Sequence, residues 1–149
     1  MTDAFATSGR AAFYDGRLAL LVIEDALIHR TIISRIADKS GFSTVAASSI
    51  EAAAERLRSR DFDCITLDLS LGEEVGGEFL RLLADRKCQT PVIIISGSDA
   101  EVVEETSRLG RALDINLRTP LHKPIDLGLL RDMLEQIRAC SGRYRLASV

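Results

Sequence analysis

Two kinds of hydrophobic pattern alternate along the chain. Short apolar runs without alternation, such as Leu18–Ile23 and Pro91–Ser96, are typical of strands that are covered on both faces of a parallel sheet. After the first run, apolar residues recur at helical spacing from Leu27 to Ile36, and Gly41 supplies a stop signal. The same order of strand and helix repeats along the chain, which predicts an α/β fold.

Five such units can be placed on the sequence. The predicted strands are 18–23, 42–47, 63–69, 91–96 and about 117–122, and the predicted helices are 27–39, 48–60, 78–85, about 99–112 and 126 to about 140. Ser48 and Glu51 form a capping box at the start of the second helix, and three glycines mark a loop at Ser70–Gly77. Because parallel strands require crossover connections, we expect a flavodoxin-like, doubly wound, five-stranded sheet of order 2-1-3-4-5 with five helices.

The size and composition are those of one ordinary globular domain. The chain has 149 residues, of which 46% are hydrophobic and 28% charged, which argues against disorder. We expect residues 1–17 to be a flexible leader, 18–140 the folded domain and 141–149 a tail. With so few residues outside the domain, we expect any output activity to lie in a separate protein.

Net charge and cysteine content narrow the possible binding partners and the cellular compartment. The formal net charge of -3 and the small number of aromatic residues argue against direct binding of nucleic acid. The apolar runs are too short to cross a membrane, and no signal peptide is evident. Three widely spaced cysteines fit neither a zinc site nor a disulfide framework, so a cytoplasmic location is expected.

Acidic, hydroxyl and basic residues lie at the carboxyl ends of the predicted strands, where ligands bind in such sheets. They are Glu24 and Asp25 after the first strand, Asp68 at the third, Ser96 at the fourth and Lys123 after the fifth. Three carboxylates close together repel one another and need a cation, and oxygen ligands of this kind suit Mg²⁺. A lysine and a serine opposite them would bind phosphoryl oxygens, so the set suggests phosphoryl transfer to a carboxylate.

Four motifs in this order resemble a known family. They are VIED at Val22–Asp25, TLDLS at Thr66–Ser70, IISGS at Ile94–Ser98 and HKP at His122–Pro124. Together they resemble the receiver domain of bacterial two-component response regulators, over about Leu18 to Cys140. The longer stretch before the lysine is similar to receivers that precede EAL-type cyclic-di-GMP phosphodiesterases.

The resemblance implies a role for each site residue. Asp68 would accept the phosphoryl group from a sensor histidine kinase or a histidine phosphotransfer protein. Mg²⁺ would be held by Glu24, Asp25, Asp68 and the backbone carbonyl of Ser70. Ser96 and Lys123 would contact the phosphoryl group, and the peptide bond from Lys123 to Pro124 would be cis. The protein would then be a signalling protein rather than an enzyme. It would act by binding a separate output protein or through a phosphorelay, and it could form a homodimer.

One position departs from the family pattern. Pro120 stands where the family usually has an aromatic switch residue, three positions before Lys123. We therefore expect the conformational change to use the long segment after the fourth helix. Proline also lacks a backbone N–H, which suits only an edge strand.

Two other function classes stay open. A haloacid-dehalogenase-like phosphatase also uses a nucleophilic aspartate with Mg²⁺, but it needs a second aspartate where Ser70 stands. A receiver-like docking module that never turns over phosphate is the other alternative. On sequence alone, His29 and His122 are interpreted as surface residues of a helix and a strand end.

Overall fold

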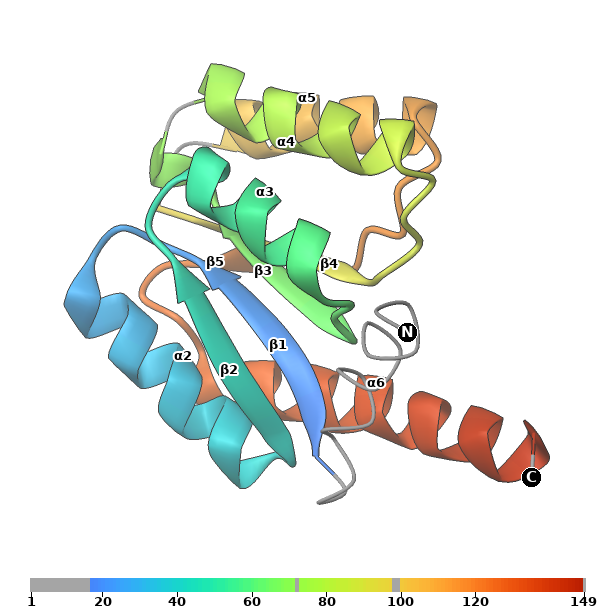
Figure 1. The fold of residues 1–149 in the computed structure, drawn as a ribbon. Helices are drawn as coiled ribbons and strands as arrows, with labels where there is room; N and C mark the ends of the chain where they lie inside the picture. Colours follow the sequence, from blue (N-terminus) through green and yellow to red (C-terminus); the bar gives the residue numbers. More distant parts are fainter. Residues whose placement is uncertain (1–16, 72, 98–99, 149) are drawn as a thin grey trace.

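Five parallel strands form one sheet in the order β2-β1-β3-β4-β5 (Figure 1). The computed structural model describes residues 17–71, 73–97 and 100–148. The strands are β1 (Leu18–Ile23), β2 (Phe42–Ala47), β3 (Cys64–Asp68), β4 (Val92–Ser96) and β5 (Leu121–His122). The expected doubly wound sheet and its strand order are thereby confirmed.

Helices cover both faces of this sheet (Figure 1). They are α2 (Leu27–Lys39), α3 (Ile50–Ser59), α4 (Glu73–Asp85), α5 (Ala100–Ala112) and α6 (Leu127–Ser148), and a short 3-10 helix, η2, spans Leu69–Leu71. The helices α3, α4 and α5 pack on one face, and α2 and α6 pack on the other. None of the helices in the described part of the chain is both long and apolar enough to cross a membrane.

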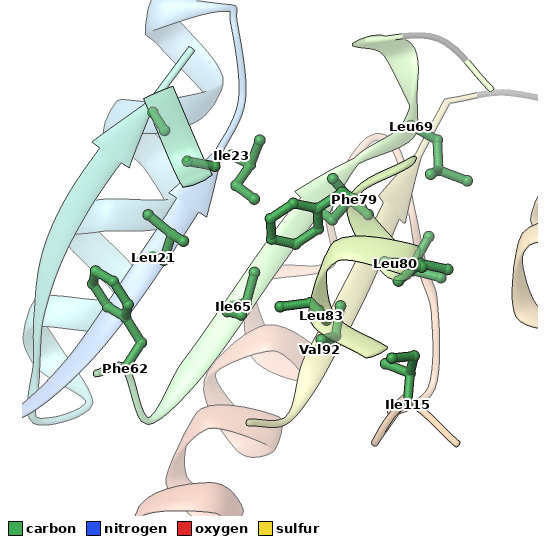
Figure 2. Packing of buried hydrophobic residues seen from close by; sticks show 14 of the residues in the cluster. Leu21, Ile23, Phe62, Ile65, Leu69, Phe79, Leu80, Leu83, Val92 and Ile115 are labelled. Carbon is green, nitrogen blue, oxygen red and sulfur yellow. The ribbon is translucent and has the colours of Figure 1, made fainter. Parts of the chain in front are cut away.

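The larger hydrophobic core lies between the sheet and helices α3 to α5 (Figure 2). Phe79, Leu80 and Leu83 of α4 pack against Leu21 and Ile65 of the two central strands, and all five side chains are fully buried. Every residue of β1 and β3 is buried, as expected for strands covered on both faces. Close packing on both faces therefore fixes the position of β1 and β3, and with it the position of the residues at their carboxyl ends.

Helix α4 begins at Glu73, five residues before the predicted start at Glu78. The glycines at 76 and 77 were expected in a loop, but they lie inside the helix. A Cβ atom at Gly76 would lie 3.0 Å from Cδ2 of Leu69, so the missing side chain lets the helix pack closely on η2. Tertiary packing here outweighs the low helix propensity of glycine.

Two other helix ends differ from the prediction. The side chain of Ser49, rather than Ser48, caps α3 by accepting a hydrogen bond from the backbone N–H of Ala52. Helix α6 does not end near Cys140 but continues to Ser148, beyond the sheet (Figure 1). The residues after Cys140 include a single glycine and no proline, so nothing stops the helix there. Of the leader predicted for residues 1–17, all but Arg17 lies outside the described residues.

The fifth strand is shorter than predicted and interrupted. Leu117 forms an isolated bridge with Val92, and Leu121 pairs with Ile95. The two pairing residues of β4, Val92 and Ile95, are three positions apart, whereas their partners Leu117 and Leu121 are four positions apart. The edge segment therefore has one extra residue, which forms a bulge. Leu117 accordingly packs in the core on the α5 side and Leu121 in the core on the α6 side. Pro120 lies in this bulge, where its missing N–H interrupts no strand pairing.

Candidate phosphoacceptor site

The carboxyl ends of four neighbouring strands bring the predicted residues together. Glu24 directly follows β1, and Asp68 is the last residue of β3. Strands β1 and β3 are adjacent, with Ile23 paired to Leu67. Ser96 ends β4, and Lys123 follows β5 at the edge. The topology thus collects at one sheet edge residues that lie far apart in sequence.

Three acidic residues form the centre of this site. One carboxylate oxygen from each of Glu24, Asp25 and Asp68 lies within 4.8 Å of the others. Glu24 and Asp68 are each only 1% exposed, whereas Asp25 is exposed. A donor set made only of carboxylate oxygens, open on one side, fits a hard divalent cation such as Mg²⁺.

The ammonium group of Lys123 lies directly on the acids. Its Nζ is 3.1 Å from Oδ2 of Asp68 and 3.3 Å from Oε1 of Glu24. The lysine side chain is only 15% exposed, so both ion pairs are largely shielded from solvent. Lys123 therefore offsets much of the repulsion between the two buried carboxylates.

A third group contacts the same ammonium. Nδ1 of His29 lies 3.0 Å from Nζ of Lys123 and 3.7 Å from Oε2 of Glu24. Sequence reasoning interpreted this histidine as a surface residue, because no spacing links it to Lys123. The available signal was its position only four residues after Asp25, at the start of the predicted helix, which places it near the same end of the sheet.

Ser70 contributes more contacts than the sequence indicated. Its backbone N–H donates to Oδ1 of Asp68 at 3.0 Å, and its hydroxyl donates to Oδ2 of the same carboxylate. These bonds fix the orientation of the Asp68 carboxylate. A phosphatase of the haloacid-dehalogenase type needs a second carboxylic acid two positions after its nucleophilic aspartate. Here that position is Ser70, which instead donates hydrogen bonds to Asp68.

The two buried carboxylates differ in acidity. Burial first, and then a hydrogen bond with Asp68, raises the pKa of Glu24. Burial alone would also raise the pKa of Asp68, but hydrogen bonds from Glu24, Ser70 and Lys123 outweigh it and lower that pKa. Of the two buried carboxyl groups, Glu24 is therefore the weaker acid and Asp68 the stronger one.

The remaining predicted residues lie beside this centre. Ser96 is buried, one position beyond the residue that pairs with Asp68, and its carbonyl accepts the backbone N–H of Lys123 at 2.9 Å. The peptide bond between Lys123 and Pro124 is cis. The arrangement therefore combines a buried aspartate, an acidic cluster that could hold a cation, a buried hydroxyl residue and a lysine ammonium, which suits phosphoryl transfer.

Comparison with known proteins agrees with this geometry. The sequence model of the response regulator receiver domain matches residues 20–135. The chain is 34% identical over 130 residues to a protein-glutamate methylesterase/protein-glutamine glutaminase from Burkholderia thailandensis, covering 83% of this chain and 36% of that protein. It is also 34% identical over 118 residues to the regulatory protein VirG of Agrobacterium tumefaciens, covering 79% of this chain and 37% of that protein. The chain thus spans little more than a third of the length of these relatives.

Solved structures share the fold. The chemotaxis response regulator CheY4 of Vibrio cholerae superposes with a TM-score of 0.68 at 20% identity, over 81% of this chain and 98% of that one. The receiver domain of the Francisella response regulator 1452 superposes with a TM-score of 0.70 at 21% identity, over 84% of this chain and 99% of that one.

Proposed function

The chain belongs to the response regulator receiver domain family, and from that premise we propose that it accepts a phosphoryl group on Asp68. The observation that carries the proposal is the pairing of the buried Asp68 carboxylate with the Lys123 ammonium inside a cluster of three acidic residues. A carboxylate oxygen of Asp68 attacks the phosphorus of a phosphohistidine. The new P–O bond forms as the P–N bond breaks, and the donor imidazole leaves with the electron pair.

The side chains of Glu24, Asp25 and Asp68, with the carbonyl of Ser70, are the proposed ligands of Mg²⁺. When bound, the cation supplies positive charge for the phosphoryl oxygens. Lys123 supplies a second, fixed positive charge, and Ser96 offers a hydroxyl to a phosphoryl oxygen. The chain's own contribution is to hold these groups in place before the donor arrives.

A partner that carries the phosphohistidine needs a surface on which to dock. Leu27 and Ile28 begin α2, two and three positions after Asp25, and they are 68% and 67% exposed. Large apolar side chains this exposed beside a reactive site are typical of interaction surfaces. We place the docking of a histidine kinase or phosphotransfer protein there.

The signal is the added charge, about −1.5 to −2 units at neutral pH. It would shift an existing equilibrium of the chain toward a form that binds an output partner or passes the phosphoryl group on. We place the change in the segment between α5 and β5, because Pro120 excludes an aromatic switch at that position. A cytoplasmic location follows from the proposed donors.

The test is intact mass after incubation with acetyl phosphate, with and without Mg²⁺. We expect the wild type to gain one phosphoryl group only with Mg²⁺, and Asp68→Asn to gain none. Asp85→Asn, an exposed aspartate on α4, is the matched control and should label like the wild type. Labelling of Asp68→Asn, or an unlabelled wild type, contradicts the proposal, and repeated turnover of p-nitrophenyl phosphate would favour a phosphatase instead.

A further inference from the structure

His29 contacts the proposed phosphoacceptor site from the first turn of α2. Its Nδ1 lies 3.0 Å from Nζ of Lys123, the shortest of the three contacts that this ammonium makes with polar side-chain atoms in the described part of the chain. The ring is 36% exposed, so it lies between the buried acids and solvent. Its position follows from the helix: α2 starts at Leu27, with Ala26 as N-cap, so its first turn lies at the same end of the sheet as the acidic pair.

The chemistry of the two groups decides which one donates. A lysine ammonium has three N–H donors and no acceptor, so Nδ1 of His29 must accept. The proton of the neutral ring therefore lies on Nε2. The three donors of Lys123 are matched by three acceptors, on Asp68, Glu24 and His29.

His29 differs from the other two acceptors because it is uncharged in this role. Both carboxylates are proposed metal ligands, and Asp68 is also the group that is modified, so their bonds to Lys123 change during the reaction. The imidazole binds neither the metal nor the phosphoryl group in this scheme. It restricts a long and flexible side chain without neutralising its charge.

We propose that His29 is a positioning residue for Lys123, holding its ammonium toward the Asp68 carboxylate; this inference rests on the phosphoacceptor function proposed above. Without the imidazole, the third N–H turns to water, and only the two carboxylates hold the ammonium, although their own contacts change when the metal and the phosphoryl group arrive. The ammonium then reaches the incoming phosphoryl oxygens less often. Because water can replace the imidazole as acceptor, the loss should be about that of one ordinary hydrogen bond, which would slow phosphorylation about threefold to tenfold.

The first test compares two replacements of similar reach. His29→Asn keeps an acceptor oxygen close to the place of Nδ1, whereas His29→Leu has none. With acetyl phosphate and Mg²⁺, we expect His29→Leu to lower the maximal rate of Asp68 phosphorylation about threefold to tenfold, and His29→Asn to stay within about twofold of the wild type. The Mg²⁺ concentration that gives half the maximal rate should not change. His122→Leu, which removes the other histidine, is the matched control and should behave like the wild type.

Equal slowing by both replacements, or slowing by neither, would overturn the proposal, since packing rather than an accepted hydrogen bond would then explain the contact. Circular dichroism checks that each variant is folded.

The second test does not depend on phosphorylation. In ¹⁵N-histidine spectra at pH 8, we expect His29 to be held as the Nε2–H tautomer, and Lys123→Ala to return it to a mixture of tautomers. An unchanged spectrum in Lys123→Ala overturns the positioning role even if Asp68 is labelled normally. A wild type that takes up no phosphate but shows the tautomer shift refutes the proposed function and leaves the contact established.

Discussion

The two halves of the site come from differently built parts of the sheet. The acids follow β1 and β3, which are fully buried and each paired with a strand on both sides. Lys123 follows β5, a two-residue edge strand that comes after a bulge. Main-chain pairing therefore fixes the acids, whereas the lysine depends much more on its side-chain contacts. Changes in the centre should therefore cost more stability than matching changes at the edge.

The largest expected effect tests the contrast in stability. Leu21 in β1 and Leu121 in β5 are both buried, at 0% and 2% exposed. We expect Leu21→Ala to lower the free energy of unfolding by about 3–5 kcal/mol and Leu121→Ala by about 2–3 kcal/mol, because an edge site can collapse more easily around the cavity. Urea unfolding measures both. A larger loss at the edge than in the centre would contradict this comparison.

A smaller loss of stability is expected for a substitution in α5 at the place where the bulge packs against it. A Cβ atom at Gly110 would lie 2.3 Å from Cδ1 and 2.9 Å from Cγ of Leu117, so that side chain must move. We expect Gly110→Ala to cost about 1–3 kcal/mol by overpacking.

Shortening Leu117 tests whether its close approach to the new Cβ atom causes this loss of stability. The double variant Gly110→Ala/Leu117→Ala should be more stable than the sum of the two single changes predicts. Gly128→Ala, whose new Cβ would lie 3.5 Å or more from other side chains, is the control and should cost nothing. Strictly additive losses would show that the close approach of Leu117 is not the reason.

A pH-dependent effect tests the acid half of the site. Because burial and the bond with Asp68 raise the pKa of Glu24, protonation of Glu24 stabilises the native state. That contribution is complete below the unfolded pKa of about 4.5 and is lost as pH rises through the folded pKa. Glutamine stays neutral at every pH.

We therefore expect Glu24→Gln to gain stability relative to the wild type as pH rises above about 4.5, with the gain levelling off at higher pH. Urea unfolding in EDTA from pH 4 to 8 measures this. The exposed Asp25→Asn serves as the control, and a relative stability of Glu24→Gln that falls with pH would contradict the assigned direction.

The smallest effect is expected at Pro120. Proline stabilises a compatible position mainly by restricting the unfolded chain, so Pro120→Ala should cost about 0.4–1 kcal/mol. The labelling of Pro120→Ala by acetyl phosphate should match that of the wild type, since Pro120 is not one of the proposed site residues. A loss above about 2 kcal/mol would mean that the proline shapes the bulge rather than merely fitting it.

Much of the fold could be predicted because its signals are local. Apolar runs mark the strands, and the acids, the serine and the lysine follow them directly. The start of α4 was missed because the packing of Gly76 on Leu69 is not visible in the sequence. The bulge was missed because it depends on pairing between residues far apart in the chain.

The same distinction applies to the site. Asp68 and its acidic neighbours were found from strand ends, where residue position decides spatial position. The contact of His29 with Lys123 joins residues 94 positions apart through two side chains, and no periodicity reports it. Side-chain contacts of this kind become visible only once the helix and the strand end are placed in space.

The interrupted edge also determines where a foreign strand could join this sheet. A free edge offers unpaired N–H and C=O groups to another chain. At β5 only two residues lie in register, and the proline before them has no N–H to offer. At the opposite edge β2 presents six residues, and the Arg17 side chain already occupies the carbonyl of Phe42 at its start. Self-association through strand addition would therefore occur at β2, at the far side of the sheet from Lys123.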